Sequence, residues 1–220
     1  MPHIARRDFE DHGAAPLTRE EFGRIACVSR ETHERLEAYI ARLRVWQRRF
    51  NLVSADSMAD VWRRHVLDSA QLFQYLPRSS RRLVDLGSGA GFPGLVLAIL
   101  GSPGVELVER NSRKCAFLAD AARHAGVTVT IHNADIKTMP AAPADVVTAR
   151  ACAPLPRLLD YAERFVAPTT VCLFLRGARV DEELAEVAID WKMRVQWIVS
   201  KSNARATRLR IQEVARVSPR

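Results

Sequence analysis

From residue 83 onward, short apolar runs alternate with longer stretches in which apolar residues recur at helical spacing. The apolar runs predict the strands Leu83–Leu86, Val105–Val108, Val127–Ile131, Asp145–Thr148 and Val171–Leu175. The amphipathic stretches predict the helices Pro93–Leu100, Arg113–Ala125, Leu155–Val166 and Asp181–Ala188. Regular alternation of strands and helices is typical of an α/β fold with a parallel sheet.

The last part of the chain departs from this alternation. Two further strands are predicted at Val195–Val199 and Leu209–Val217, with no helix between them. Strands joined without a crossover helix form an antiparallel hairpin. We therefore expect a mostly parallel, seven-stranded sheet with one antiparallel strand.

Residues 1–80 carry helical signals and no predicted strand. Thr18 followed by Glu21 forms a capping box at the start of a helix. A second helix is expected up to about Arg49, and a third over Asp56–Leu76. We therefore divide the chain into an N-terminal helical extension, residues 1–80, and a cofactor-binding domain, residues 81–220.

The first predicted strand runs into a glycine-rich turn, where Asp85 is followed by Gly87, Gly89, Gly91 and Gly94. Such a turn lets a nucleotide-like ligand approach the main chain closely. The last three glycines match the dinucleotide fingerprint of NAD(P)-dependent oxidoreductases. Counted from Asp85, the spacing is also that of S-adenosylmethionine methyltransferases, and a carboxylate suits the sulfonium cation of that cofactor. A tight turn without a ligand is the third alternative.

Three further features near the turn bear on this choice. Phe92 and Pro93 stand where a dinucleotide turn keeps its backbone open, which favours S-adenosylmethionine. Glu109 ends the second strand about twenty residues beyond the glycines, where an acid binds ribose hydroxyls. Asp135 follows the third strand, where it can bond an adenine amino group, although an aspartate there is also a common turn former.

The formal net charge is +8, and it is unevenly distributed. Residues 1–80 carry +2, residues 81–190 carry −1, and residues 191–220 carry +7. Clustered positive charge favours an anionic polymer, because neutralised phosphates release counterions. A basic end that only keeps the protein soluble is the alternative.

Composition excludes several other classes of protein. No apolar run approaches the roughly eighteen residues of a membrane span, and residues 1–10 lack the apolar core of a secretory signal. The four cysteines form no Cys-x-x-Cys pair, so we expect buried, reduced thiols in the cytoplasm and no metal site.

Several ordered motifs resemble one known family. They are Asn51-Leu52-Val53-Ser54, Arg64-His65-Val66-Leu67-Asp68-Ser69, the segment Asp85–Gly94 with its Gly-Phe-Pro-Gly end, Val147-Thr148-Ala149-Arg150-Ala151 and Leu175-Arg176-Gly177. Together they are similar to the bacterial small-subunit ribosomal RNA methyltransferase G family, also called glucose-inhibited division protein B. The resemblance spans about residues 36–177. Two positions depart from the family: it usually has lysine at Arg176 and aspartate at Glu109.

The resemblance implies a Rossmann-like class I methyltransferase that acts in the cytoplasm, and we expect a monomer. Its implied reaction is S-adenosylmethionine-dependent methylation at N7 of one guanine, position 527 in the family, in 16S ribosomal RNA, free or in the small subunit. Among the cofactor-binding residues, Gly87 and Phe92 would line the cofactor, Ala134 and Asp135 its adenine, and Arg150 the region near the methyl group. Asp85, Gly89, Gly91 and Glu109 complete the expected cofactor set. A non-catalytic RNA-binding relative of the same fold is a further alternative.

Substrate RNA is expected at Arg64, His65, Arg150 and Arg176. Further phosphate contacts are expected at basic residues near the two ends of the chain: Arg42, Arg48, Arg63, Lys201, Arg205, Arg208 and Arg210. His65 with Asp68 could instead form a buried structural pair, and Arg150 a salt bridge to Asp85 or Asp145. Guanine N7 has a lone pair and no proton, so no general base is needed and we nominate no catalytic residue.

Overall fold

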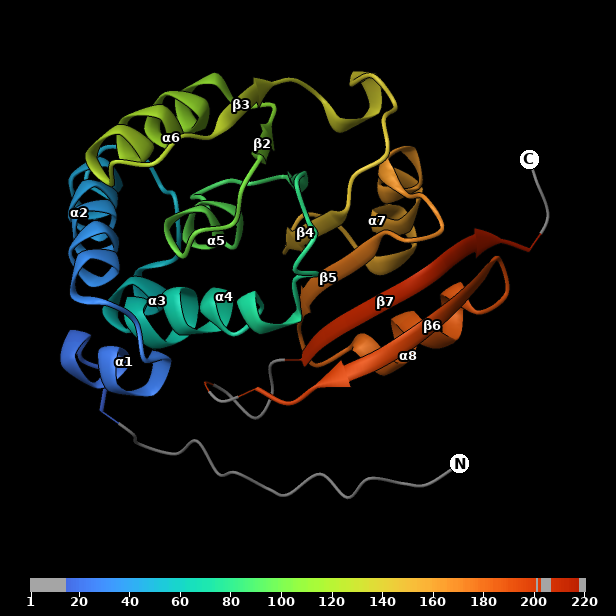
Figure 1. Cartoon of the computed structure of the whole chain (residues 1–220), viewed down its shortest axis with the longest axis horizontal. Helices are drawn as coiled ribbons and strands as arrows, with labels where there is room; N and C mark the ends of the chain where they lie inside the picture. Colours follow the sequence, from blue (N-terminus) through green and yellow to red (C-terminus); the bar gives the residue numbers. More distant parts are fainter. Residues whose placement is uncertain (1–14, 201, 203–206, 218–220) are drawn as a thin grey trace.

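A central sheet organises the fold of the computed structural model, which describes residues 15–200, 202 and 207–217 (Figure 1). Within these residues the sheet has seven strands in the order β3-β2-β1-β4-β5-β7-β6. The strands are β1 Leu83–Leu86, β2 Val105–Glu109, β3 Thr130–Asn133, β4 Val146–Arg150, β5 Val171–Arg176, β6 Trp191–Ile198 and β7 Thr207–Arg216. β7 runs antiparallel to both neighbours, and the other pairs are parallel. The expected single reversed strand is confirmed.

Helices cover both faces of the sheet and enclose two hydrophobic cores. On one face lie α2 Arg30–Gln47, α5 Gly94–Ile99 and α6 Ser112–His124. On the other face lie α7 Leu155–Ala162 and α8 Val180–Val187. Strand β1 supplies both cores, because side chains alternate across a strand: Leu83 faces the first core, and Val84 and Leu86 face the second.

The N-terminal helices pack on the first of these cores. Phe22 of α1 (Arg19–Ala26) and Leu36 of α2 belong to the same cluster as Leu95 of α5. The two parts of the chain on either side of residue 80 thus share one core. Their division into two domains remains a prediction.

The helix expected over Asp56–Leu76 is wrong as a single element. It is divided into α3 Ala55–Ala59, the π-helix η1 Trp62–Leu67, α4 Asp68–Ala70 and the 3₁₀ turn η2 Phe73–Tyr75. Asp60 leaves the helical conformation, and its carboxylate accepts hydrogen bonds from Leu17 N (2.7 Å) and Arg63 Nε (3.0 Å). Hydrogen bonds of an aspartate side chain to nearby groups stabilise non-helical backbone conformations, and so they compete with continuation of the helix.

The third strand begins three residues later than expected, at Thr130. Helix α6 ends in a Schellman motif, in which Gly126 has φ +65° and Val127 N donates to Ala122 O at 3.1 Å. The chain therefore leaves the helix over residues 127–129 before it pairs with β2. The sixth strand begins earlier than expected, at Trp191, and α7 ends at Ala162, before the 3₁₀ turn η4 Glu163–Phe165.

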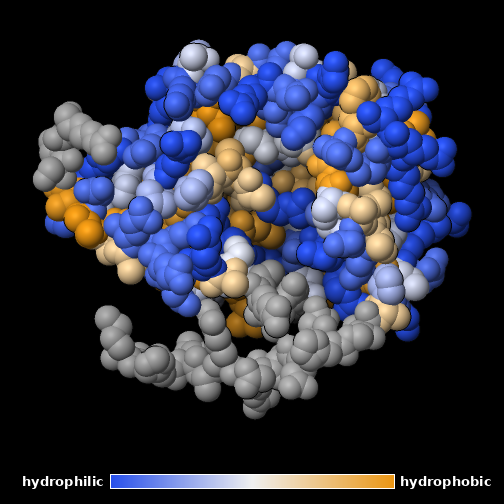
Figure 2. Space-filling view, turned by 180° about the vertical axis from the view of Figure 1, so that it is seen from behind, coloured by the Kyte–Doolittle hydropathy of each residue, from blue (hydrophilic) through white to orange (hydrophobic). Residues whose placement is uncertain are grey.

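Two further findings concern cysteines and membranes. Cys115 and Cys172 are buried and Cys152 is half-buried, but the expectation of a buried thiol is wrong for Cys27, which caps α1 in a left-handed conformation at the surface. Among the residues that the structure describes, no helix is both long and apolar enough to cross a bilayer. The face seen in Figure 2 is largely hydrophilic, with hydrophobic residues in a hollow near its centre.

Candidate functional site

A pocket of about 370 Å³ lies beyond the carboxyl ends of β1, β2 and β4. This is the edge of an open α/β sheet at which ligands bind. Its lining residues are Gly87, Gly89, Val108, Glu109, Arg110, Lys114, Ala134, Asp135, Ile136, Ala151, Cys152, Ala153, Pro154, Arg157 and Tyr161. Five of the nine expected cofactor residues thus line one pocket: Gly87, Gly89, Glu109, Ala134 and Asp135.

The glycine-rich turn brings main chain directly to the pocket wall. Gly87 has φ +66°, and a Cβ built on it would lie 2.5 Å from Cys152 Sγ. Gly89 also has a positive φ of +54°. Both the backbone conformation and the close approach to Cys152 therefore require glycine at position 87.

Glu109 is held in place by the backbone around it. Its side chain is buried, Oε2 accepts a hydrogen bond from Gly89 N at 3.0 Å, and Oε1 accepts one from Asn111 N at 2.8 Å. The carboxylate thus joins the glycine turn to the end of β2. Each oxygen keeps a second lone pair, so the group can still accept bonds from a ligand hydroxyl.

Asp135 and Ala134 form another part of the wall. Asp135 Oδ1 accepts a hydrogen bond from Lys137 N at 2.9 Å and caps the 3₁₀ turn η3 Ile136–Thr138. Ala134 N donates to Glu109 O at 3.2 Å. The turn-forming role of Asp135 and a place beside a ligand are therefore compatible.

Asp85 does not line the pocket. It is completely buried behind the turn, where Oδ1 accepts a hydrogen bond from Thr148 Oγ1 at 2.6 Å. Burial raises the pKa of this carboxyl to about 6, against the opposing hydrogen bonds from Thr148 and Ser88. A Cβ on Gly94 would lie 2.7 Å from Asp85 Cβ, so glycine there leaves room for the acid. The position of Asp85 supports an indirect role, through the shape of the turn.

Gly91 and Phe92 do not line the pocket. A Cβ on Gly91 would lie 3.0 Å from Tyr39 Oη. The Phe92 ring stacks on His65, with centroids 4.7 Å apart and planes at 18°, and the Arg150 guanidinium lies 5.0 Å from its centroid. The assignment of both residues to the cofactor stays a prediction.

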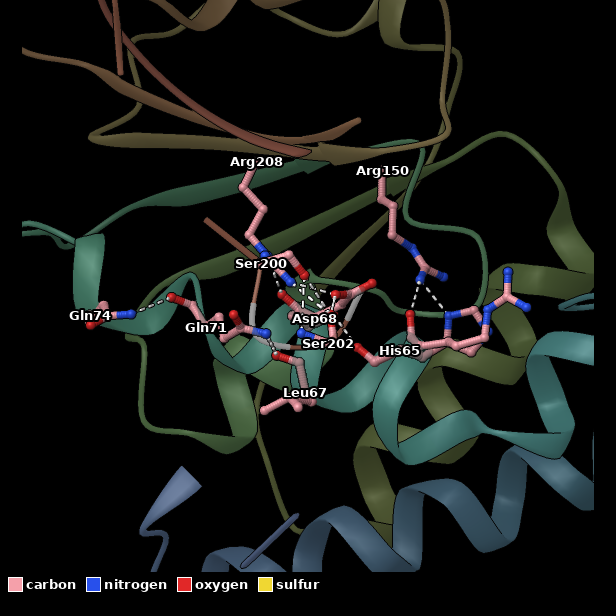
Figure 3. Close-up of polar contacts among 11 residues, drawn as sticks. His65, Leu67, Asp68, Gln71, Gln74, Arg150, Ser200, Ser202 and Arg208 are labelled. Atoms are coloured by element: carbon pink, nitrogen blue, oxygen red, sulfur yellow. Dashed lines mark hydrogen bonds and ion pairs between the residues drawn. The ribbon is translucent and has the colours of Figure 1, made fainter. Parts of the chain in front are cut away.

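Arg150 and His65 form a pair at the end of β4 (Figure 3). Arg150 Nη1 donates hydrogen bonds to Arg64 O at 3.2 Å and to His65 Nδ1. Asp145, one expected partner of Arg150, instead accepts hydrogen bonds from the backbone N–H of Arg81 and Arg82. Because Nδ1 accepts, the proton of neutral His65 is assigned to Nε2.

The stability of the protein should depend on the titration of His65. Burial, followed by the charges of Arg150 and Arg64, lowers its pKa from 6.5 to about 3. Between these values the unfolded chain binds a proton that the folded chain does not, so the free energy of unfolding should fall as pH drops from about 6.5 towards 3. The variant His65→Asn retains an acceptor but cannot titrate, so it should lose less stability over this range. Thermal unfolding of both proteins between about pH 7 and pH 4 measures the difference, and parallel curves would contradict it.

Asp68 has its own partners, separate from His65 (Figure 3). Arg208, whose side chain is 0% exposed, forms an ion pair with Asp68 Oδ1, and Ser202 Oγ donates to the same oxygen. Arg208 Nε also donates to Asp68 O at 3.3 Å. The expected phosphate contact at Arg208 is therefore wrong, because this guanidinium is buried against α4 and cannot reach RNA.

The remaining expected RNA contacts differ in their availability. Arg176 forms hydrogen bonds to both carboxylate oxygens of Glu183, at 2.7 Å each, and its side chain is 8% exposed. Arg42 pairs with Asp120 and Arg63 with Asp60. Arg48 and Arg64 are exposed, and Arg210 is half-buried. Lys201 and Arg205 lie outside the described residues.

Sequence reasoning missed the part of the pocket that follows β4 and begins α7. Ala151, with φ +49°, Cys152 and Pro154 form this wall, and Arg157 and Tyr161 extend it along α7. The signal was present, because parallel strands β1 and β4 are neighbours and their carboxyl ends share one edge.

The comparison with known families decides between the alternatives. A sequence model of the GidB family, described as rRNA small subunit methyltransferase G, matches residues 32–209. The chain belongs to this family. The expected resemblance is confirmed, and the oxidoreductase alternative has no support.

Individual GidB relatives match nearly the whole chain. The ribosomal RNA small subunit methyltransferase G of Rhodospirillum rubrum is 52% identical over 200 residues, which cover 91% of this chain and 100% of the relative. That of Paramagnetospirillum magneticum is 50% identical over 189 residues, covering 86% and 92%.

Solved structures place this GidB chain in a broader fold class. A mutant of MtNAS in complex with S-adenosylmethionine has a TM-score of 0.56 at 16% identity, covering 90% of this chain and 84% of that one. The ribosomal protein L11 methylase of Lactobacillus delbrueckii subsp. bulgaricus has a TM-score of 0.52 at 14% identity, covering 66% and 76%. The fold is that of a Rossmann-like class I methyltransferase.

Proposed function

We propose that this protein transfers the methyl group of S-adenosylmethionine to N7 of one guanine in 16S ribosomal RNA, position 527 in the family's usual count. The observation that carries the proposal is the family match over residues 32–209, with relatives that are 50% and 52% identical. Small-subunit ribosomal RNA would be the partner, free or within the subunit. We further propose that the protein works in the cytoplasm as a monomer.

The residues of the pocket suit this cofactor. A pocket of about 370 Å³ lies within the range of small-molecule sites. Glu109 offers a fixed carboxylate to the ribose hydroxyls, and Asp135 with Ala134 offers polar groups to adenine. Gly87 lets the main chain approach Cys152 closely, so that both residues line the pocket and backbone atoms of the turn can contact a ligand.

The chemistry asks little of the protein beyond positioning. When bound, S-adenosylmethionine supplies a methyl group activated by its sulfonium. Guanine N7 attacks with a lone pair and has no proton to lose, so no side chain must act as a base. Holding reactants in line can contribute up to about 7–11 kcal/mol to lowering a barrier.

Arg150 is the side chain that we place nearest to the reacting base. It lies at the end of β4, next to Ala151 and Cys152 of the pocket wall, and His65 and Arg64 O fix one of its nitrogens. Its other nitrogens keep N–H donors for RNA. Arg64 is exposed beside it and would bind phosphate, and Arg176 would act by shaping the wall through Ala153 O, which accepts its hydrogen bond at 2.7 Å.

Methyl transfer from labelled S-adenosylmethionine tests the proposal. The acceptors are deproteinised 16S RNA and small subunits from a strain without this modification, and nuclease mapping identifies the labelled base. Label on a single guanine N7 is the expected result. RNA binding without methyl transfer would indicate a non-catalytic relative. Binding of NAD without methyl transfer would indicate that the glycine-rich turn belongs to a dinucleotide-binding oxidoreductase.

A further inference from the structure

Three cations at the pocket have no counter-ion among the described residues. Arg110 follows β2, Lys114 lies near the start of α6, and Arg157 lies near the start of α7. Arg110 and Arg157 are exposed, and Lys114 is half-buried. Across the described parts of the chain, no ion pair or side-chain hydrogen bond engages any of the three. By contrast, Arg176 near the same wall is paired with Glu183.

These cations flank the pocket from two sides of the sheet. Helix α6 packs on the first core and α7 on the second, so Lys114 and Arg157 approach from opposite layers. In Figure 1 the two helices accordingly stand apart, with strands of the sheet between them. A linear polyanion that contacted both sides would cross the mouth of the pocket.

The charge balance favours such a polyanion when the cofactor is bound. The three cations exceed the two pocket carboxylates, Glu109 and Asp135. S-adenosylmethionine is itself a net cation, because its ammonium and sulfonium outweigh its carboxylate. The loaded pocket is therefore more positive than the empty one, and a single cofactor carboxylate cannot neutralise the rim.

We propose that phosphates of the substrate RNA bind Arg110, Lys114 and Arg157 and so close the pocket over the cofactor. The cofactor then enters before the RNA and stays until the RNA leaves. This inference rests on the proposed function and adds an order of binding to it. Because binding free energies are linked, RNA must tighten cofactor binding by the same factor by which the cofactor tightens RNA binding.

The reaction itself weakens this coupling. Guanine N7 forms a bond to the methyl carbon, the carbon–sulfur bond breaks, and its electron pair stays on sulfur. The cofactor thus loses its sulfonium charge, and the base becomes positive. S-adenosylhomocysteine is neutral overall, so RNA should retain it less strongly than it retains the cationic cofactor.

Dissociation of an unreactive cofactor analogue tests the closure. Sinefungin carries an ammonium-bearing carbon in place of the sulfonium, and its release from the protein is followed with and without saturating unmethylated small subunits. We expect release at least about tenfold slower with subunits, and a smaller effect for S-adenosylhomocysteine. In the variant Arg110→Ala/Arg157→Ala, the ratio of the two rates should fall below about twofold.

Arg78 and Arg81 provide the matched control. Both are exposed, and they precede β1 at the opposite edge of the sheet. The variant Arg78→Ala/Arg81→Ala loses the same charge and should keep the full retention ratio. The inference is overturned if bound subunits leave the release rate of sinefungin unchanged, or if both double variants have the same retention ratio. In either case, methyl transfer by the wild-type protein would still support the proposed function. Absence of subunit binding in a filter assay would overturn both.

Discussion

Replacing Asp68 by alanine should lower the free energy of unfolding by about 3–5 kcal/mol, the cost of leaving a buried charge without its partner. Arg208 is fully buried and forms an ion pair with Asp68, which also accepts a hydrogen bond from Ser202 Oγ. Burial already opposes both charges, since it raises the pKa of Asp68 and lowers that of Arg208. Thermal unfolding should record a decrease of about 6–20 °C in the midpoint.

A double variant separates the charge effect from lost packing. In Asp68→Ala/Arg208→Met the buried cation is gone, so at least half of the lost stability should return. Glu186 is exposed on α8, and Glu186→Ala should change stability by no more than about 0.5 kcal/mol. A double variant no more stable than Asp68→Ala would show that the pair acts through packing alone.

Replacing Gly87 by valine should weaken S-adenosylmethionine binding at least about 100-fold, because the turn must move to accommodate the new side chain. Its Cβ would lie 2.5 Å from Cys152 Sγ, and valine strongly disfavours φ +66°. Gly87 and Cys152 both line the pocket, so relieving the contact and the backbone strain would change the shape of the pocket wall. Isothermal titration of the folded variant with the cofactor measures the loss.

Gly126 controls for backbone strain without contact. Its φ of +65° nearly equals that of Gly87, but a Cβ there meets nothing within 4 Å. Gly126→Ala should therefore cost about 1–2 kcal/mol of stability and leave cofactor affinity unchanged. Gly87→Val binding at wild-type affinity would contradict the assignment of this turn to the cofactor.

The fold was predictable wherever local pattern and tertiary structure agree. Leu83–Leu86 is the strand that its apolar run predicts, and the helix-free end of the chain does form a hairpin. The π-helix Trp62–Leu67 was not predictable, since its periodicity resembles an α-helix and its register depends on distant partners. Arg208 was misjudged for a related reason: a charged residue is expected in solvent unless a partner such as Asp68, 140 positions away, is known.

The same distinction applies to the site. Glu109 beside Gly89 follows from two adjacent parallel strands, so a rule about strand ends finds it. Asp85 is also an acid at the end of a strand, yet it does not line the pocket. It lies on the opposite side of β1 from Val84 and Leu86, and the spacing of the glycines does not indicate this. Arg157 escaped notice because α7 approaches the pocket from the second layer, which only the folded sheet brings close.

The position of β7 between β5 and β6 has a consequence for synthesis of the protein. A ribosome completes β6 before β7, but within the described residues β6 pairs only with β7, so it cannot join the sheet until β7 emerges. Until then the edge of β5 that pairs with β7 is exposed, and Asp68 lacks its partner Arg208, which is encoded 140 codons later. A nascent chain stalled before residue 207 therefore resembles a substrate for chaperones and proteases more than a finished enzyme.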